Sequence, residues 1–370
     1  MSLMANHWAG SGWPVSLLTL DSPGPYFYPL HPDVNFSGLN LSGPLGSPLP
    51  GAFRMLKRLQ VLRAGIKQTN PDVVISFNDA INVIVVFALA GAKIPVIVSE
   101  RNDPHAHHLK RPWGILRPLA YRMAVRVTCQ TEPALAFFPA AIRRRGMVIP
   151  NPVPKISIPS ESKFNGNMPL PGKTLLAMGR LSPQKGFDLL LQAFAPLASR
   201  HPDWTLEIWG EGAERKSLEH QVSGLGLANQ VRLPGLTKEP REIMRKADLF
   251  VLPSRYEGFP NVLCEAMACG LPVVSFDCPS GPAEIIRQGI DGLLVPAANT
   301  QALANALERL MSSDVERRKF GAMAVEVGDR FGLDRVMALW TDLVLEVASR
   351  QARMVKRLEP KNKTTFSVDG

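Results

Sequence analysis

The sequence has few cysteines, and their spacing excludes two kinds of protein. Only four occur among 370 residues, and none forms a C-x-x-C pair or has a histidine at the spacing of a metal site. Neither a zinc site nor a disulfide framework is therefore indicated. We expect reduced thiols in a cytoplasmic protein. The four residues are Cys129, Cys264, Cys269 and Cys278.

The sequence also lacks a long unbroken apolar run. The longest, residues 81–98, contains Gly91, Lys93 and Pro95, which would interrupt the helix of about 20 apolar residues that a membrane span requires. A buried helix followed by a buried strand fits this run better. The first residues have no cationic start followed by an apolar centre, so no secretory signal is indicated.

Acidic residues are scarce in the front half. Residues 1–170 hold 17 Lys and Arg but only 8 Asp and Glu, whereas the remaining residues hold 25 and 24. The front half is therefore expected to meet an anionic partner, which could be nucleic acid, a membrane surface or a phosphorylated substrate. We expect no nucleic-acid partner, because the basic clusters lack interleaved aromatic residues and a recognition motif.

Apolar strands and helices alternate in both halves of the sequence. Near-continuous runs of Val and Ile predict parallel strands that are covered on both faces. Because 370 residues are too many for one core, we predict an α/β protein of two Rossmann-like domains whose parallel sheets face each other across a cleft. The predicted front-half strands are residues 14–20, 72–77, 95–100 and 126–131. Six strands are predicted in the rear half, at residues 174–180, 205–210, 231–235, 249–254, 272–277 and 292–296. The predicted helices include residues 53–68, 82–90, 113–123, 300–328 and 334–355.

A polar stretch without periodicity, residues 151–172, separates the two halves. It is typical of a connection between domains. We predict an N-terminal domain over residues 1–155, a linker over 156–172, a C-terminal domain over 173–332, a helix over 333–355 that crosses back to the N-terminal domain, and a frayed tail over 356–370.

Two glycine-bearing stretches follow strands of the rear half. In "GRLSPQKGFD", the glycines allow the backbone to approach a ligand, and Arg180 and Lys185 can offset two phosphate charges. The alternative is a pair of solvated surface charges on an ordinary turn. "GEGAERKSLE" is no dinucleotide fingerprint, because Arg215 stands where the third glycine belongs. It reads instead as a tight turn into a helix.

The stretch "YEGFPNVLCEAMACG" places Glu257 in a loop and Glu265 about one turn into the helix that follows. The amides at the start of that helix, Asn261 to Leu263, favour an anion such as a diphosphate. Glu265 could then accept hydrogen bonds from the hydroxyls of one sugar, and Glu257 from those of a second. For either glutamate alone, the alternative is an ordinary surface acid.

Together these stretches resemble the donor half of the nucleotide-sugar glycosyltransferases of family four, whose two-domain fold is called GT-B. The resemblance is strong over residues 173–296 and weaker before residue 151. It implies an N-terminal acceptor-binding domain, a C-terminal donor domain, and transfer of a hexose with retention, without a metal or another cofactor. UDP is the commonest nucleotide of such donors. The resemblance implies catalytic roles for Arg180, Lys185 and Glu257, and donor-binding roles for Gly179, Leu236, Asn261, Val262, Leu263 and Glu265.

The stretch "SERNDPH" resembles the branch of bacterial transferases that build surface polysaccharides, often on lipid-diphosphate carriers. Most of the family has a histidine here that contacts the sugar, whereas this chain offers Glu100, Arg101, Asn102 and His105. We expect the acceptor side to be formed by Arg101, Asn102 and His105, and the acceptor to be a saccharide that is free or lipid-linked.

The family opens with a strand and a glycine-rich loop, whereas this sequence opens in what resembles the following helix. We expect that strand and loop to be missing and the chain to be less stable for it. A misassigned start, an incomplete gene and a defective copy all remain open.

Three basic clusters lie in the front half, over residues 53–68, 110–126 and 143–145. They suggest peripheral contact with the anionic inner face of the cytoplasmic membrane, each basic group contributing about 1 kcal/mol. The alternative for each cluster is a solvated helix face. Two rival functions also remain: a sugar-nucleotide 2-epimerase, and a non-catalytic subunit that binds a sugar nucleotide.

Overall fold

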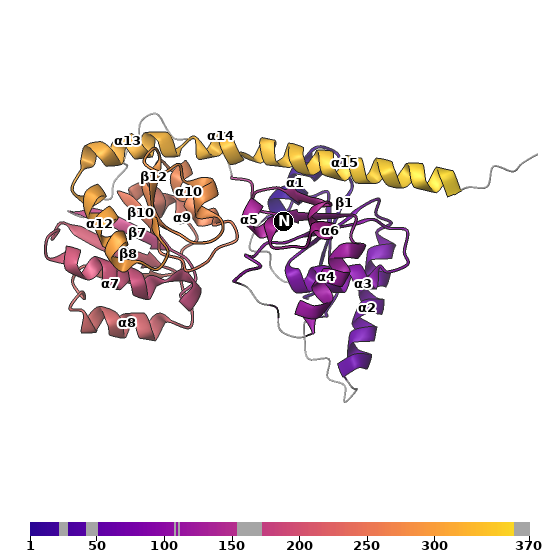
Figure 1. The fold of residues 1–370 in the computed structure, drawn as a ribbon, viewed down its shortest axis with the longest axis horizontal. Helices are drawn as coiled ribbons and strands as arrows, with labels where there is room; N and C mark the ends of the chain where they lie inside the picture. The colour runs from indigo at the N-terminus through magenta and orange to yellow at the C-terminus, as the bar shows by residue number, and fades with distance from the viewer. Residues whose placement is uncertain (22–28, 42–50, 107–108, 110–111, 154–171, 359–370) are drawn as a thin grey trace, which may run out of the picture.

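The computed structural model describes residues 1–21, 29–41, 51–106, 109, 112–153 and 172–358. The predicted linker, apart from its last residue, and residues 359–370 of the predicted tail lie outside the described residues. The described chain forms two α/β lobes that lie side by side, and a long helix runs from one along the other (Figure 1).

Four parallel strands form the larger sheet of the N-terminal lobe, in the order β3-β4-β5-β6. Two further parallel strands, β1 and β2, form a separate sheet among the described residues. Strands β2 and β6 were not predicted, because β2 lies in a stretch rich in Pro and Gly, which is typical of loops, and β6 has only three residues. The strands are β1 (Val15–Thr19), β2 (Val34–Gly38), β3 (Val74–Phe77), β4 (Val96–Ser99), β5 (Arg126–Cys129) and β6 (Gly146–Val148).

Helices cover this larger sheet, and their apolar faces form one core with it. Helix α4 has its predicted bounds. Helix α3 begins earlier than predicted, at Asp79, whose carboxylate accepts a hydrogen bond from the N–H of Ala80 at 2.7 Å and so supports the first turn. The helices of this lobe are α1 (Ser2–Gly10), α2 (Gly51–Gln68), α3 (Asp79–Ala88), α4 (Trp113–Met123), α5 (Glu132–Ala136) and α6 (Ala140–Arg143).

The C-terminal lobe contains a parallel sheet of six strands in the order β12-β11-β10-β7-β8-β9. Its strand β10 is apolar on both faces and buried along its whole length, as its run of Leu, Phe and Val predicts. All six predicted strands of the rear half are present. They are β7 (Lys173–Met178), β8 (Trp204–Trp209), β9 (Val231–Gly235), β10 (Leu249–Leu252), β11 (Val273–Asp277) and β12 (Gly292–Pro296).

The helices of the C-terminal lobe follow these strands in the usual alternation. The apolar run predicted as helical over residues 300–328 is divided into α12, α13 and the start of α14, because Ser313 caps a new helix by accepting a hydrogen bond from the N–H of Glu316. The helices are η1 (Pro183–Lys185), α7 (Phe187–Ala198), α8 (Arg215–Gly224), α9 (Pro240–Lys246), α10 (Asn261–Ala268), α11 (Pro282–Ile285), α12 (Thr300–Met311), α13 (Asp314–Ala324) and α14 (Val327–Phe331).

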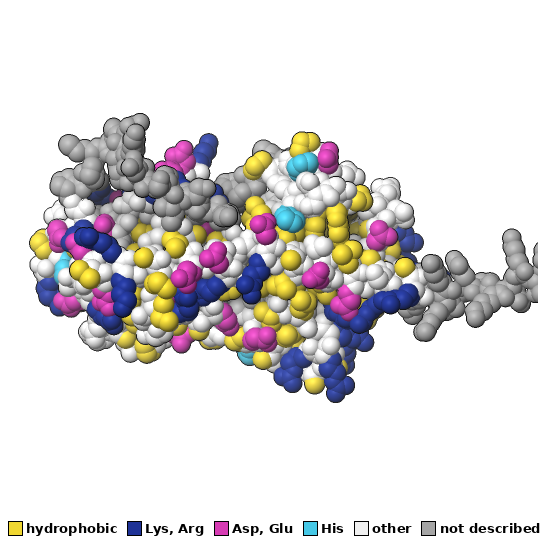
Figure 2. Space-filling model, turned by 90° about the horizontal axis from the view of Figure 1, so that it is seen from above, with side chains coloured by type: hydrophobic (Ala, Val, Ile, Leu, Met, Phe, Trp, Pro, Cys, Tyr) yellow, Lys and Arg dark blue, Asp and Glu magenta, His cyan; other side chains and the backbone are white. Residues whose placement is uncertain are grey.

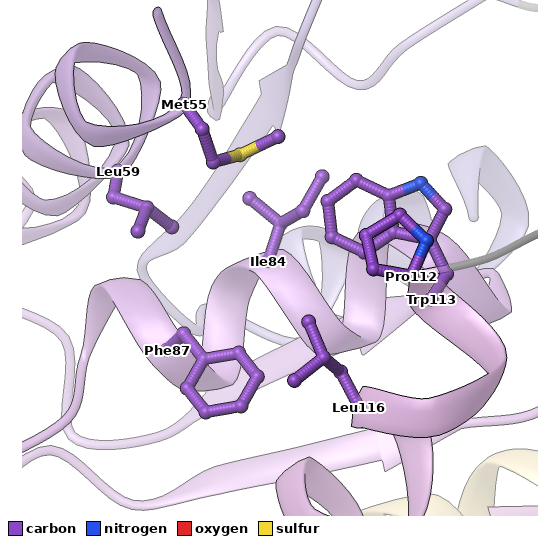
Figure 3. Close-up of a pocket in the computed structure, with 7 residues that line it drawn as sticks. All are labelled: Met55, Leu59, Ile84, Phe87, Pro112, Trp113 and Leu116. Atoms are coloured by element: carbon purple, nitrogen blue, oxygen red, sulfur yellow. The ribbon is translucent and has the colours of Figure 1, made fainter. Parts of the chain in front are cut away.

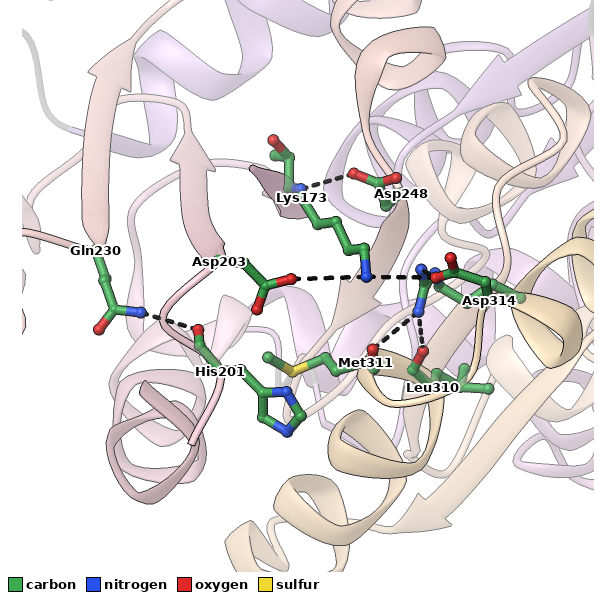
Figure 4. Close-up of polar contacts among 10 residues, drawn as sticks. Lys173, His201, Asp203, Gln230, Asp248, Leu310, Met311 and Asp314 are labelled. Atoms are coloured by element: carbon green, nitrogen blue, oxygen red, sulfur yellow. Dashed lines mark hydrogen bonds and ion pairs between the residues drawn. The ribbon is translucent and has the colours of Figure 1, made fainter. Parts of the chain in front are cut away.

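Polar contacts tie together the amino-terminal end of this sheet (Figure 4). At the start of β7, Lys173 Nζ lies 3.6 Å from Asp203 Oδ2 and 3.4 Å from Asp314 Oδ1. Nearby, Gln230 donates a hydrogen bond to the carbonyl of His201 at 3.1 Å. Since ligands of open α/β sheets bind at the carboxyl ends of the strands, this end of the lobe is structural.

The long helix α15 (Leu333–Leu358) follows the C-terminal lobe in sequence but packs on the N-terminal lobe (Figure 1). Trp340 is fully buried in a cluster that includes Ile97 and Ile149. Polar contacts add to this packing, since Trp8 Nε1 donates to Thr341 Oγ1 at 2.9 Å. No helix within the described residues has the length and apolarity to span a bilayer.

The chain passes between the lobes at two places that touch each other. The N–H of Val153 donates to the carbonyl of Phe331 at 2.8 Å, and Val153 forms a parallel bridge with Gly332. Val153 is the last described residue before residues 154–171, and Gly332 directly precedes α15. Both crossings between the lobes therefore meet at one joint.

Candidate functional site

Two loops meet at the carboxyl ends of the neighbouring strands β7 and β10. The N–H of Arg255 donates to the carbonyl of Gln184 at 2.8 Å, and Gln184 Nε2 donates to the carbonyl of Tyr256 at 3.1 Å. The guanidinium of Arg255 also binds both carboxylate oxygens of Asp188, at 2.8 and 2.7 Å, which lowers the pKa of Asp188. The stretches predicted to form the donor site are therefore held together.

The close approach of these loops requires glycine at position 186. Gly186 has a φ of +65°, and a Cβ placed there would collide with the carbonyl of Pro253. Only glycine combines that backbone conformation with that contact. Gly186 follows Lys185 and immediately precedes α7.

Lys185 and Glu257 form an ion pair between the two loops. Lys185 Nζ lies 2.6 Å from Glu257 Oε1, and the Ser254 hydroxyl donates to the same oxygen at 2.6 Å. The side chains are 17% and 8% exposed, so water screens the pair little. Both residues were predicted to lie in one site, with Lys185 binding a diphosphate and Glu257 binding a sugar. Their direct pairing was not predicted.

Arg180 lies at the start of the same loop, two residues after the end of β7, and is exposed. Within the described residues its guanidinium has no hydrogen bond or ion pair, which leaves its donors free for a ligand. Beside it, the side chain of Lys185 passes over Gly179, its carbons lying 3.4 Å from where a Cβ would stand. A Cβ at position 179 would therefore stand in ordinary van der Waals contact with the lysine.

The start of α10 differs in one respect from the prediction. The N–H of Leu263 donates to the carbonyl of Pro260 at 3.0 Å and closes the first turn, so it is not available to an anion. This corrects the role predicted for Leu263, whose side chain is buried in the core. The amides of Asn261 and Val262 remain as donors, because the first N–H groups of a helix have no partner within it.

Glu265 is partly buried within α10, and burial raises the pKa of its carboxyl, an effect that nearby Arg241 opposes. A half-buried carboxylate with no strong cationic partner is suited to accept hydrogen bonds from hydroxyl groups. Leu236, predicted to lie near the nucleotide base, follows β9 and is 78% exposed. An apolar side chain so exposed is available to a flat ring.

At the boundary between the lobes, Arg101 links both sides through Asn151. One guanidinium nitrogen of Arg101 donates to Asn151 Oδ1, and Asn151 Nδ2 donates to Asn261 Oδ1 at the start of α10, at 2.6 Å. The guanidinium also lies 5.2 Å from the centre of the Phe77 ring. Burial lowers the pKa of Arg101 to about 10, and within the described residues it has no carboxylate partner.

Gln130 was missed by sequence reasoning. It follows β5, its side chain is 5% exposed, and its Oε1 has no hydrogen-bond partner among the described residues. A Cβ added to Gly258 of the opposite lobe would lie 3.0 Å from that oxygen and 2.7 Å from the carbonyl of Arg101. The sequence feature that could have indicated Gln130 as a site residue is its position as a polar residue at the carboxyl end of a predicted parallel strand.

The remaining residues of "SERNDPH" have separate surroundings. Glu100 is buried and accepts a hydrogen bond from the Tyr121 hydroxyl at 2.8 Å, so it belongs to the core of the N-terminal lobe. Asn102 lies at the boundary, its Cα 3.2 Å from a Cβ placed on Gly258. His105 is exposed, and its ring packs edge-on against Phe137. Arg101 and Asn102 are thus the members of the motif at the lobe boundary.

Among the described residues, no group of three or more His, Cys, Asp and Glu side chains could hold a metal ion. Residues 1–152 match the glycosyl transferase 4-like domain, and residues 160–326 match the glycosyl transferases of group 1. Both halves of the chain are glycosyltransferase domains. The predicted relation to glycosyltransferases is thereby confirmed.

Curated relatives agree with this assignment. An exopolysaccharide phosphotransferase from Streptomyces coelicolor is 35% identical over 83% of this glycosyltransferase, which spans only 32% of that protein. The amylovoran biosynthesis glycosyltransferase AmsD from Erwinia amylovora is 26% identical over 93% of both chains. A Campylobacter jejuni N-acetylgalactosaminyltransferase, whose name includes diNAcBac-PP-undecaprenol, is 27% identical over 79% of both chains.

Solved structures share the fold. Sucrose-phosphate synthase from Thermosynechococcus elongatus superimposes with a TM-score of 0.79 at 20% identity, over 94% of this chain and 92% of that one. HepE from Anabaena, in complex with UDP and glucose, gives a TM-score of 0.70 at 22% identity, over 84% and 86%. These likenesses, together with the two parallel sheets, confirm the predicted α/β fold of the GT-B type.

Proposed function

We propose that this glycosyltransferase transfers a hexose from a UDP-sugar, with retention of configuration and without a metal, to a lipid-diphosphate-linked saccharide in the synthesis of a surface polysaccharide. The observation that carries the donor part is the Lys185–Glu257 contact of 2.6 Å, made between the two loops that follow β7 and β10. It places a cation and a carboxylate at the carboxyl ends of the strands, beside the loop that leads into α10.

In this proposal, the donor diphosphate lies between the C-terminal lobe's cations and the start of α10. Arg180, whose guanidinium has no partner among the described residues, binds the phosphate, and Lys185 directs some of its N–H donors from Glu257 to the phosphate. The amides of Asn261 and Val262 add donors whose positions are fixed by the helix. Glu265 accepts hydrogen bonds from the ribose hydroxyls, and the exposed Leu236 covers the base.

The chemical demand is to stabilise the negative charge that develops on the nucleoside diphosphate as the glycosidic bond lengthens. Fixed cationic and N–H donors meet this demand better than mobile water, because they need no reorganisation. We assign no nucleophilic role to Glu257, whose carboxylate is already held by Lys185 and Ser254. The attacking hydroxyl approaches from the face of the leaving phosphate, and its proton passes to that phosphate.

The choice of UDP and of the acceptor draws on relatives. HepE was crystallised with UDP, the name of the Campylobacter jejuni relative includes diNAcBac-PP-undecaprenol, and AmsD is named for amylovoran. The excess of Lys and Arg in the N-terminal half adds support, since it fits an anionic carrier and contact with an anionic membrane surface.

The test compares Arg180→Ala and Lys185→Ala with a matched control, Arg318→Ala, an exposed arginine on α13. With a labelled UDP-sugar and a lipid-linked acceptor, each site variant should lower turnover by about a hundredfold, since the loss of one fixed donor typically raises the barrier by about 3 kcal/mol. The control should retain its rate. Unchanged turnover in both site variants would refute the donor site, and a labelled epimer without transfer would favour the 2-epimerase.

A further inference from the structure

The N-terminal lobe has an apolar pocket between α2, α3 and α4, away from the lobe boundary. Figure 3 shows side chains from all three helices facing one another around it. The pocket has a volume of about 370 Å³, and every residue that lines it keeps some contact with solvent, so it is open rather than a sealed packing defect. It is lined by Met55, Leu59, Ile84, Phe87, Pro112, Trp113 and Leu116.

Exposed apolar side chains extend this pocket over the helix surfaces. Leu56 on α2 is 52% exposed and stands three residues before Leu59, whereas Leu119 on α4 is 51% exposed and stands three residues after Leu116. Residues three apart are neighbours on a helix. Ile115 adds a side chain that is 66% exposed. Single exposed leucines are ordinary, but a contiguous set around an open apolar pocket indicates a binding surface.

The exposed charged side chains that the structure describes on α2, α3 and α4 are all basic, since Asp79 at the start of α3 is buried. No Asp or Glu occurs in residues 34–71 or 104–131, which include α2 and α4. Lys57 on α2 and Arg122 on α4 are both exposed, and Arg122 follows Leu119 by three residues. The side of this lobe that carries α15 is basic too, since Figure 2, which looks down on that side, shows Lys and Arg side chains gathered near the end of α15.

An open apolar pocket surrounded by basic side chains fits an anionic membrane better than a protein partner. A protein partner or a second copy of the chain would have to supply acidic groups in the right places, whereas an anionic bilayer offers negative charge everywhere along its surface and hydrocarbon beneath it. Long basic side chains can keep their charges among the headgroups while apolar neighbours enter the membrane. Trp113, which has an apolar ring and one N–H, is typical of the interface between the two.

We propose that the surface formed by α2, α3 and α4 is a docking site for an anionic phospholipid bilayer, and that one acyl chain of a phospholipid enters the pocket beside Trp113. The site deepens the membrane contact of the proposed function and rests on it. It is independent of the donor site in the C-terminal lobe, so either assignment can fail alone.

Trp113 makes the proposal directly measurable. Wild type and Trp113→Phe are mixed with vesicles of phosphatidylglycerol and phosphatidylcholine in equal parts, whose acyl chains carry bromine, a short-range quencher of tryptophan fluorescence. We expect quenching in wild type that is largely absent from Trp113→Phe, and that weakens as salt is added. Vesicle binding without any difference in quenching between the two proteins would overturn the proposal, as would equal binding to vesicles of phosphatidylcholine alone.

A second set of variants does not depend on the folding of Trp113→Phe. Ile115 is so exposed in wild type that Ile115→Gln should not disturb folding. This substitution should lower the affinity for vesicles about tenfold, because it removes one apolar side chain that enters the membrane. Val315→Gln, at a 79% exposed position of the other lobe, is the control and should bind as wild type does. Equal affinities for both variants would refute the docking site. The affinity of wild type for UDP-sugar without vesicles tests the donor site separately.

Discussion

The ion pair between Lys185 and Glu257 allows a quantitative test of the site. In Lys185→Met, the Glu257 carboxylate remains only 8% exposed in its wild-type position and keeps only Ser254 as a donor. Removing one partner of a buried pair costs about 3–5 kcal/mol of folding free energy. Because Lys185 is itself 17% exposed, water can enter in its place, and we expect the lower end, about 3 kcal/mol.

A double-mutant cycle at pH 7 measures this effect. Urea unfolding gives the free energy of unfolding for wild type, Lys185→Met, Glu257→Gln and the double variant. The double variant has no stranded charge and should recover most of the loss, so the coupling energy should be about 2 kcal/mol. Arg180→Met is the control, because exposed side chains of this kind usually change stability by less than about 0.5 kcal/mol. If Lys185→Met is no less stable than Arg180→Met, or if the cycle is additive, the pair does not contribute as described.

Three further predictions concern other parts of the molecule. Gly258→Ala should place a methyl group 2.7 Å from the carbonyl of Arg101 and so force the lobes apart. We expect the transfer activity to fall at least tenfold with little change in the thermal midpoint of unfolding. Full activity of this variant would contradict the contact between the lobes. Glu265 has a raised pKa because it is buried, so the folded protein keeps this proton at a pH where the unfolded chain has lost it. The stability it contributes is present at low pH and is lost as the pH rises through the folded pKa; Glu265→Gln should reduce that loss on the alkaline side of the ordinary glutamate pKa, and identical pH profiles of the thermal midpoint would contradict it. Trp340→Ala should cost about 3–5 kcal/mol, because Trp340 is fully buried against the N-terminal lobe, and a loss below about 1 kcal/mol in urea unfolding would show that α15 packs there only loosely.

Regular elements were predictable from the sequence wherever a pattern had room to repeat. Helix α4 was predicted with its exact ends, since Pro112 and the β-favouring residues after Met123 bound it. The parallel strands of both lobes follow from runs of Val, Ile and Leu that are buried on both faces. Strand β6 was not predictable, because the three residues Gly146–Val148 acquire their conformation by pairing with β5.

The parts of the candidate site that depend on short stretches of sequence were predictable. Lys185 and Glu257 each follow an apolar strand, and the carboxyl ends of parallel strands share one edge of a sheet. Their direct pairing depends on β7 and β10 being neighbours, which no local pattern indicates. The chain from Arg101 through Asn151 to Asn261 joins segments far apart in sequence and in different lobes, so it could be seen only in the folded molecule.

The placement of α15 has a consequence for the integrity of the molecule. Its apolar face completes the interior of a lobe formed mainly by residues that precede it by more than 180 positions, as the cluster that Trp340 shares with Ile97 and Ile149 shows. A single cut within residues 154–171 would therefore yield two fragments that stay associated, because the C-terminal fragment would still anchor itself in the N-terminal one through this helix. The two fragments could be produced separately and recombined, and each would be an incomplete folding unit without the other.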